Sequence, residues 1–170
     1  MAVYQIKAQP LTAEAFAPYG SVIGLPQKVD EHTLPTDRFT FYPKICTYEC
    51  DGGKFQIGVS SFYKRPFRTC SLERHYTSQE FMSPLDGDII IVFCKNKGMD
   101  RDEIADYRNC EAFIVRQDQG VVVNTGVWHW TPMPVDHDTS IICSFGYDVE
   151  VNDVDQQDFP EREVVEVVLD

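Results

Sequence analysis

The chain has 170 residues, of which 43% are hydrophobic and 25% charged, and its formal net charge is −12. This length suits one domain, residues 1–170, with a core large enough to fold without a disulfide or a metal. The acidic charge opposes binding to nucleic acids and anionic membranes, because such partners require Lys and Arg to neutralise phosphates. A small anionic substrate remains compatible, because salt screens distant charges within about 10 Å.

The first ten residues alternate polar and apolar side chains, without a basic segment followed by a long apolar run. We therefore expect neither a signal peptide nor a membrane-spanning helix. A chain without an export signal stays in the cytoplasm, where thiols are reduced, and we expect its cysteines to serve mainly as buried packing residues. These cysteines are Cys46, Cys50, Cys70, Cys94, Cys110 and Cys143.

The first predicted element is a short helix over residues 13–19. Thr12 can cap its N-terminus, Glu14 suits the positive first turn, and Gly20 is placed to end it. Short apolar segments follow between turn residues, and many short strands at such spacing indicate an all-β sandwich or barrel. The predicted strands cover residues 38–42, 55–62, 89–93, 112–115, 120–123 and 140–147.

Turns and polar segments separate these strands. Turns are expected at residues 51–53, 86–88 and 97–98, and the polar residues 97–109 predict a surface loop or a single helical turn. The acidic C-terminal segment, residues 153–170, contains four valines that favour packing on a sheet. They are Val164, Val165, Val167 and Val168.

The segment from Leu72 to Gly87 carries the first candidate site. Residues two apart on a strand face the same side, so Glu73 and His75 would point together into a barrel, and Glu80 can return to that side after a turn. The pattern resembles the first motif of the cupins, HxH(x)3–4E(x)6G, with Glu73 in place of the first histidine. Glu80 and Gly87 keep the spacing of that motif.

The segment from Gly120 to His129 resembles the second cupin motif, which ends in PxG(x)2H, with Asn124 in place of the proline. The cupin resemblance implies a double-stranded β-helix barrel, or jelly roll, after a short N-terminal helix. The candidate ligands suit Zn, Mn, Fe or Ni, although a metal-free polar pocket is an open alternative, and no organic cofactor is expected. The candidate metal ligands are Glu73, His75, Glu80 and His129.

Several segments together resemble one branch of the cupins, the ureidoglycolate lyase family. They are the opening at residues 10–23, the LERH sequence at 72–75 with Pro84 and residues 90–92 after it, and the GVWH sequence at 126–129. The resemblance runs from about residue 10 to residue 155. It implies cleavage of ureidoglycolate to glyoxylate and urea, a step of purine catabolism.

The chain departs from the family pattern in both motifs. The family has a histidine and a basic residue where this chain has Asn124 and Thr125, a further histidine at Trp130, and a glutamine at Glu80. Loss of imidazoles and gain of a carboxylate change which groups can move protons. These changes also make the site more similar to that of a metal-binding cupin.

Cleavage of ureidoglycolate is an elimination from a carbinolamine. A base removes the hydroxyl proton as the C–N bond breaks, and an acid protonates the departing urea nitrogen. We expect His129 to be the base and Glu80 or Glu73 the acid, because neighbouring carboxylates in a desolvated barrel can raise one another's pKa. A bound metal would polarise the substrate oxygens.

Arg65 and Arg68 lie just before the first motif and are candidates for binding the substrate carboxylate, together with Asn124. The alternative for the two arginines is a solvated charged loop. Trp128 and Trp130 flank His129, and strand alternation places them outside the barrel. We expect them to pack against a neighbouring strand rather than form a subunit contact.

Two functions remain open from the sequence. The first is an enzyme similar to ureidoglycolate lyase that acts on a small anionic substrate. The second is a divergent metal-binding cupin that binds or acts on a sugar or sugar acid without lyase activity. For either function we expect a homodimer, because a small barrel leaves edge strands and a sheet face that a second copy can cover.

Overall fold

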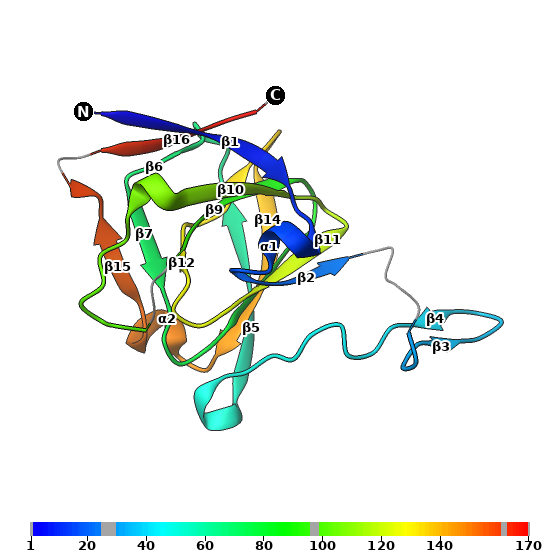
Figure 1. Ribbon diagram of the computed structural model, residues 1–170. Helices are drawn as coiled ribbons and strands as arrows, with labels where there is room; N and C mark the ends of the chain where they lie inside the picture. The colour runs from blue at the N-terminus through cyan, green and yellow to red at the C-terminus, as the bar shows by residue number, and fades with distance from the viewer. Residues whose placement is uncertain (1, 25–29, 96–98, 161–162, 170) are drawn as a thin grey trace.

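The computed structural model describes residues 2–24, 30–95, 99–160 and 163–169. Two sheets curl around a shared interior and form the barrel seen in Figure 1. The smaller, antiparallel sheet has the order β2 (Gly20–Gly24), β11 (Gln119–Val123), β8 (Glu80–Pro84), β14 (Thr139–Gly146) and β5 (Phe55–Phe62). The larger sheet begins with β15 (Asp155–Asp158), β7 (Ser71–Arg74), β12 (Trp128–His129) and β9 (Ile89–Cys94). It continues with β10 (Cys110–Val115), β1 (Val3–Pro10), β16 (Val164–Val168) and β6 (Arg68–Thr69). A further short strand, β13 (Met133–Pro134), also pairs with β9.

The cupin-like β-barrel predicted from the sequence is confirmed. β5 has the predicted bounds, and β9, β10, β11 and β14 begin or end within two residues of the prediction. The strand predicted at residues 38–42 is reduced to β4 (Thr40–Phe41), which pairs with β3 (Leu34–Pro35) in a hairpin apart from the barrel (Figure 1). β15 is too polar to be recognised from its own sequence, and it forms because β7 offers it a free edge.

β9 separates the two parts of the hydrophobic core. All of its side chains are buried. Ile90 and Val92 belong to a cluster beneath β1 and β16, whereas Ile91 and Phe93 face the barrel interior. A strand covered on both faces has a continuous apolar sequence instead of an alternating one. The central position of β9 therefore follows from its sequence.

The outer cluster contains Trp128, which is fully buried, as the strand alternation around His129 predicts. Its ring packs beneath the guanidinium of Arg74, whose carbon lies 4.1 Å from the ring centroid. Trp130 is partly buried against the same cluster. Both tryptophans pack within the chain, which confirms the packing prediction.

The predicted N-terminal helix is shorter than expected. α1 (Ala13–Phe16) begins where predicted, and the backbone N–H of Ala15 donates to Oγ1 of Thr12 at 3.2 Å. The helix ends at Phe16 rather than at Tyr19, because Pro18 has no backbone N–H to continue the ladder. The rings of Phe16 and Phe93 meet edge to face at 5.0 Å, so α1 contributes to the barrel core.

The C-terminal segment packs on the larger sheet, as its valines predict. β16 pairs in parallel with β1 and antiparallel with β6, and Val165 and Val167 are buried. α2 (Val149–Asn152), which the sequence did not predict, links β14 to β15. The chain therefore returns past β7 after the barrel strands are complete.

The connections agree with the polar segments of the sequence. The 3-10 turns η1 (Asp51–Gly53) and η2 (Tyr107–Asn109) fall in predicted turn or loop regions, whereas the turn expected at 97–98 lies outside the described residues. All six cysteines are free thiols; Cys94, Cys110 and Cys143 are buried and Cys70 is exposed. Within the described part of the chain, no helix has the length and apolar character needed to cross a membrane.

Candidate active site

Two turns carry the candidate residues into the barrel. His75 follows the end of β7 at Arg74, and the chain turns back into β8 at Glu80. His129 is the last residue of β12. The N–H of Gly126 donates to the carbonyl of His75 at 2.6 Å, and Gly126 has a φ of +76°, which glycine adopts readily. This bond joins the first motif to the second.

The structure brings His75, Glu80 and His129 together. Oε2 of Glu80 lies 3.0 Å from Nε2 of His129 and 3.6 Å from Nε2 of His75. The two imidazole rings are 5.5 Å apart, centroid to centroid. At most 12% of any of the three side chains is exposed, so solvent screens their interaction weakly.

Backbone carbonyls orient both imidazoles. Nδ1 of His75 lies 2.8 Å from the carbonyl oxygen of Asp153, and Nδ1 of His129 lies 2.9 Å from that of Val127. A carbonyl oxygen only accepts, so each Nδ1 carries the hydrogen. In its neutral form each imidazole therefore directs the lone pair of Nε2 toward Glu80.

The three groups shift one another's protonation. Burial raises the pKa of Glu80, but its interactions with His129 and His75 outweigh burial and lower the pKa to about 2. Burial lowers the pKa of His75, but its hydrogen bond and charge interaction with Glu80 raise it to about 9. Glu80 is therefore ionised at neutral pH. The sequence led us to expect a raised pKa at Glu80 or Glu73; at Glu80 the pKa is lowered instead, because two imidazoles lie beside it.

The cluster has the donor set of a divalent metal site. The ligand atoms of His75, Glu80 and His129 all lie within 4.8 Å of one another. Nε2 of His129 is buried, and among the described residues it has no aligned hydrogen-bond partner. Two imidazole nitrogens and one carboxylate oxygen suit Zn, Mn, Fe or Ni, and a cation would satisfy all three atoms at once.

Glu73 lies beside this cluster but is not part of the compact group of ligand atoms. It stands directly opposite His129 on the antiparallel neighbour strand, so the two side chains leave the same face of the sheet. Its charge contributes to the raised pKa of His75. The four ligands predicted from the sequence thus separate into three clustered groups and one adjacent carboxylate.

The two predicted substrate arginines are engaged elsewhere. The guanidinium of Arg65 donates to the carbonyls of Thr131 and Pro132, at 3.2 and 2.8 Å. Arg68 lies on β6, where its exposed guanidinium pairs with Glu166 on β16. The guanidinium of Arg68 is therefore paired on the exposed surface, whereas the clustered side chains are almost completely buried.

Asn124 lies at the edge of the site. It follows β11, whose last residue, Val123, pairs with Glu80, and its Oδ1 accepts from the side-chain amide of Gln79 at 2.9 Å. A nearby open pocket of about 560 Å³ is lined in part by Tyr48, Tyr76 and Thr125. Tyr76 after the first motif strand and Thr125 of the second motif thus meet at this pocket, whose lining does not include His75, Glu80 or His129.

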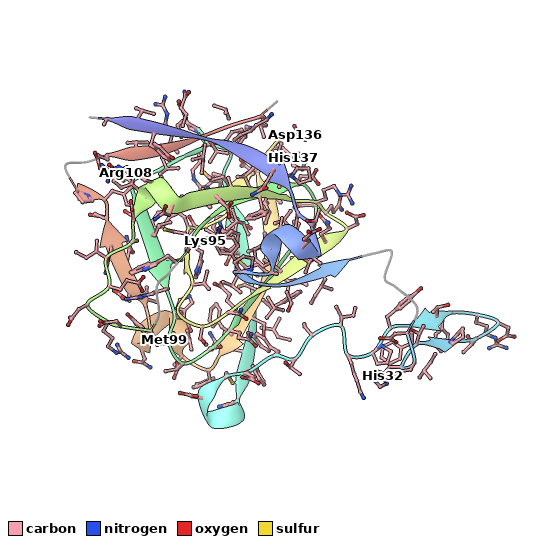
Figure 2. All side chains as sticks on the ribbon, in the orientation of Figure 1. His32, Lys95, Met99, Arg108, Asp136 and His137 are labelled. Carbon is pink, nitrogen blue, oxygen red and sulfur yellow. The ribbon has the colours of Figure 1, made fainter. Side chains whose placement is uncertain are left out.

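Sequence reasoning missed Asp153, whose carbonyl orients His75. It is 78 positions from His75, and the acidic segment around it has no motif that points to this role. The other two histidines, His32 and His137, are labelled in Figure 2 on the separate hairpin region and on the loop before β14. Nε2 of His137 lies 2.8 Å from the carbonyl of Asp86, so this ring is used outside the cluster.

The fold and the site together define a cupin-type barrel with two inward histidines and one inward carboxylate. The chain belongs to the ureidoglycolate lyase family, whose family model matches residues 3–166.

Two relatives and two solved structures illustrate the similarity. The ureidoglycolate lyase of Schizosaccharomyces pombe is 29% identical over 193 residues, covering 99% of this chain and 98% of that protein. That of Pseudomonas paraeruginosa is 30% identical over 128 residues, 73% of each chain. A dTDP-4-dehydrorhamnose 3,5-epimerase from Bacillus anthracis has a TM-score of 0.42 at 12% identity, covering 74% of this chain and 77% of that one. A dTDP-6-deoxy-D-glucose-3,5-epimerase from Legionella pneumophila has a TM-score of 0.43 at 13% identity, covering 88% of each.

Proposed function

We propose that this protein is a metal-dependent lyase that cleaves ureidoglycolate to glyoxylate and urea. Membership of the ureidoglycolate lyase family over nearly the whole chain supports the substrate and the reaction. The observation that carries the proposal is the buried group His75, Glu80 and His129 inside the matched region. Because the Schizosaccharomyces pombe relative is matched over almost its full length, the comparison spans a complete lyase rather than one of its parts.

The proposed metal is a divalent ion held by Nε2 of His75, Nε2 of His129 and a carboxylate oxygen of Glu80. When bound, such an ion supplies positive charge that binds the carboxylate and hydroxyl oxygens of the substrate and lowers the pKa of the hydroxyl. The convergence of Nε2 of His75 and Nε2 of His129 on one oxygen of Glu80 supports this assignment. Arg68 has no part in it.

The proposed proton carrier is Glu73. His129 was the base expected from the sequence, but its Nε2 is then a metal ligand and has no lone pair to accept a proton. Glu73 is opposite His129 and outside the ligand group. In the reaction, Glu73 accepts the hydroxyl proton as the C–O double bond forms, and it delivers a proton to the urea nitrogen as the C–N bond breaks. One carboxylate thus balances both proton movements.

Substrate contacts and cellular location belong to the same proposal. Asn124 is proposed to bind the ureido group at the edge of the site, a role supported by its position after Val123, the partner of Glu80. Arg65 is proposed to support the backbone after β12 through its bonds to Thr131 and Pro132.

The six free thiols support a reducing, cytoplasmic location.

The test is direct turnover. Purified protein loaded with Zn, Mn, Fe or Ni in separate samples is incubated with ureidoglycolate, and glyoxylate and urea are quantified. Equal amounts of both products, formed at a rate proportional to protein, are expected. Turnover at the uncatalysed rate with every metal would refute the lyase assignment and leave the sugar-binding cupin as the hypothesis to pursue.

A further inference from the structure

Asp153 links the C-terminal segment to the candidate site. It lies between α2 and β15, after the barrel strands are complete. Oδ2 of Asp153 accepts from the N–H of Tyr76 at 2.8 Å, the N–H of Thr77 at 2.6 Å and Oγ1 of Thr77 at 2.6 Å. One carboxylate oxygen therefore holds the turn that directly follows His75.

The same residue also reaches the imidazole through its backbone. The carbonyl oxygen of Asp153 lies 2.8 Å from Nδ1 of His75. The side chain holds the turn and the carbonyl fixes the ring, so a movement of Asp153 changes both the position and the rotation of His75. Only 7% of His75 is exposed, and water is a poor substitute for a lost carbonyl at that depth.

His129 differs from His75 in the origin of the carbonyl that orients its ring. Its Nδ1 bonds the carbonyl of Val127, two residues earlier in the chain. The acceptor of His75 comes from 78 residues away and depends on the fold of α2 and β15. Of the two histidines, His75 is thus the one whose orientation is set by a distant segment.

We propose that Asp153 is the positioning residue for His75: its carboxylate anchors the turn at residues 76–77, and its carbonyl directs Nε2 of His75 toward Glu80 and His129. The proposal deepens the proposed function, because the aligned Nε2 is one of the three ligand atoms. Groups that hold a ligand histidine by its second nitrogen typically change metal affinity about 10–100-fold when removed. Asp153 touches neither substrate nor metal and acts through His75 alone.

The variants for the test are Asp153→Ala, Asp153→Asn and the control Asp158→Ala. The alanine leaves two backbone N–H groups and the Thr77 hydroxyl without an acceptor, whereas asparagine keeps an oxygen of the same size without the charge. Asp158 also lies on the segment paired with β7, where its carboxylate accepts from the hydroxyl of Ser71. Asp158→Ala therefore removes one carboxylate from the pair of strands β7 and β15, and it serves as the matched control.

Two readouts are measured on the full chain: the Nδ1–H resonance of His75 in protein labelled with ¹⁵N-histidine, and the Zn²⁺ dissociation constant by calorimetry. The unmodified protein is expected to show a slowly exchanging Nδ1–H. Asp153→Ala should broaden or abolish this signal and weaken Zn²⁺ binding about 10–100-fold, Asp153→Asn should do so less, and Asp158→Ala should do neither.

Two results would overturn the proposal. The first is that Nδ1 of His75 carries no protected hydrogen in the unmodified protein. The second is that Asp153→Ala and Asp158→Ala change the Nδ1–H signal and Zn²⁺ binding to the same extent. If Asp153→Ala does not fold, Asp153→Asn and the unmodified protein decide the question. Failure of the unmodified protein to bind Zn²⁺ or any other metal would refute the metal of the proposed function. The Nδ1–H signal requires no metal and would still test the role of Asp153.

Discussion

Glu73 and His129 occupy directly opposite positions on β7 and β12, so a carboxylate outside the ligand group and a clustered imidazole share one face of the sheet. The two residues come from different motifs, 56 positions apart in the chain. In the proposed function, His129 holds the cation and Glu73 moves the proton.

The first prediction separates these two roles. Glu73→Gln should lower kcat about 10²–10⁴-fold, the usual contribution of positioned proton transfer, while bound metal is retained. Glu80→Gln should release metal, because it removes the negative charge between His75 and His129. Metal content by mass spectrometry and kcat are measured on both variants. Loss of metal from Glu73→Gln would place Glu73 among the ligands instead.

The second prediction concerns His129. His129→Ala should abolish metal binding and activity together, because the alanine leaves an open coordination position that neighbouring groups cannot fill. His137→Ala is the control, since Nε2 of His137 lies 2.8 Å from the carbonyl of Asp86 and His137 is not one of the clustered groups. A His129→Ala protein that keeps its metal but loses turnover would make His129 the base, as the sequence alone suggested.

The third prediction is a pH dependence of the metal-free protein. The raised pKa of His75 stabilises the fold below the ordinary value of 6.5, and this contribution is lost as the pH rises through about 9. The lowered pKa of Glu80 contributes above its ordinary value of 4.5 and is lost as the pH falls through about 2. The free energy of unfolding in urea should therefore fall between pH 6.5 and pH 9, and His75→Gln should remove most of that decrease. An unchanged slope in His75→Gln would contradict the assigned coupling.

The fourth prediction concerns the buried arginine behind the site. Arg74 is fully buried and pairs with Asp155 at 2.9 Å and with Glu103 at 3.1 Å. Arg74→Ala should destabilise the protein by about 3–5 kcal/mol, because it removes a fully buried guanidinium from two partly buried carboxylates and from the ring of Trp128. Arg68→Ala breaks a pair that solvent screens and should change the stability little. The free energy of unfolding in denaturant is measured for both variants. If both lose the same amount, burial does not make the Arg74 pairs more stabilising than the Arg68 pair.

The fifth prediction is the homodimer expected from the sequence. β5 is the edge of the smaller sheet, and Ile57 and Val59 on it are 78% and 65% exposed. We propose that a second copy covers this edge, as unpaired strand edges invite a further strand. Light scattering at micromolar concentration should give a dimer mass, and Ile57→Glu should shift it toward the monomer. A monomer for the unmodified chain would refute the dimer.

The barrel was predictable because its central strands have distinctive sequences. The run at residues 89–94 is apolar throughout since both faces of β9 are covered, and β5 and β14 are bounded by turn residues. The polar β15 and the short α2 have no such pattern. They depend on β7 and on the loop that Asp153 holds, which are tertiary contacts that no local window contains.

The site was predictable as a set of residues but not as a geometry. Motif spacing brought together His75, Glu80 and His129, because strands and their turns repeat in a fixed way. It did not separate Glu73 from the ligand group, since strand alternation gives the face of a side chain but not its distance from its neighbours. It also could not show that Arg68 pairs with Glu166, which lies almost a hundred positions later.

The proposed metal site is tested most directly by anomalous diffraction from crystals of metal-loaded protein, measured at the absorption edge of the bound metal. We expect one strong peak at bonding distance, about 2.0–2.2 Å, from Nε2 of His75, Nε2 of His129 and a carboxylate oxygen of Glu80. A peak coordinated elsewhere, or none between these three side chains in protein saturated with metal, would contradict it.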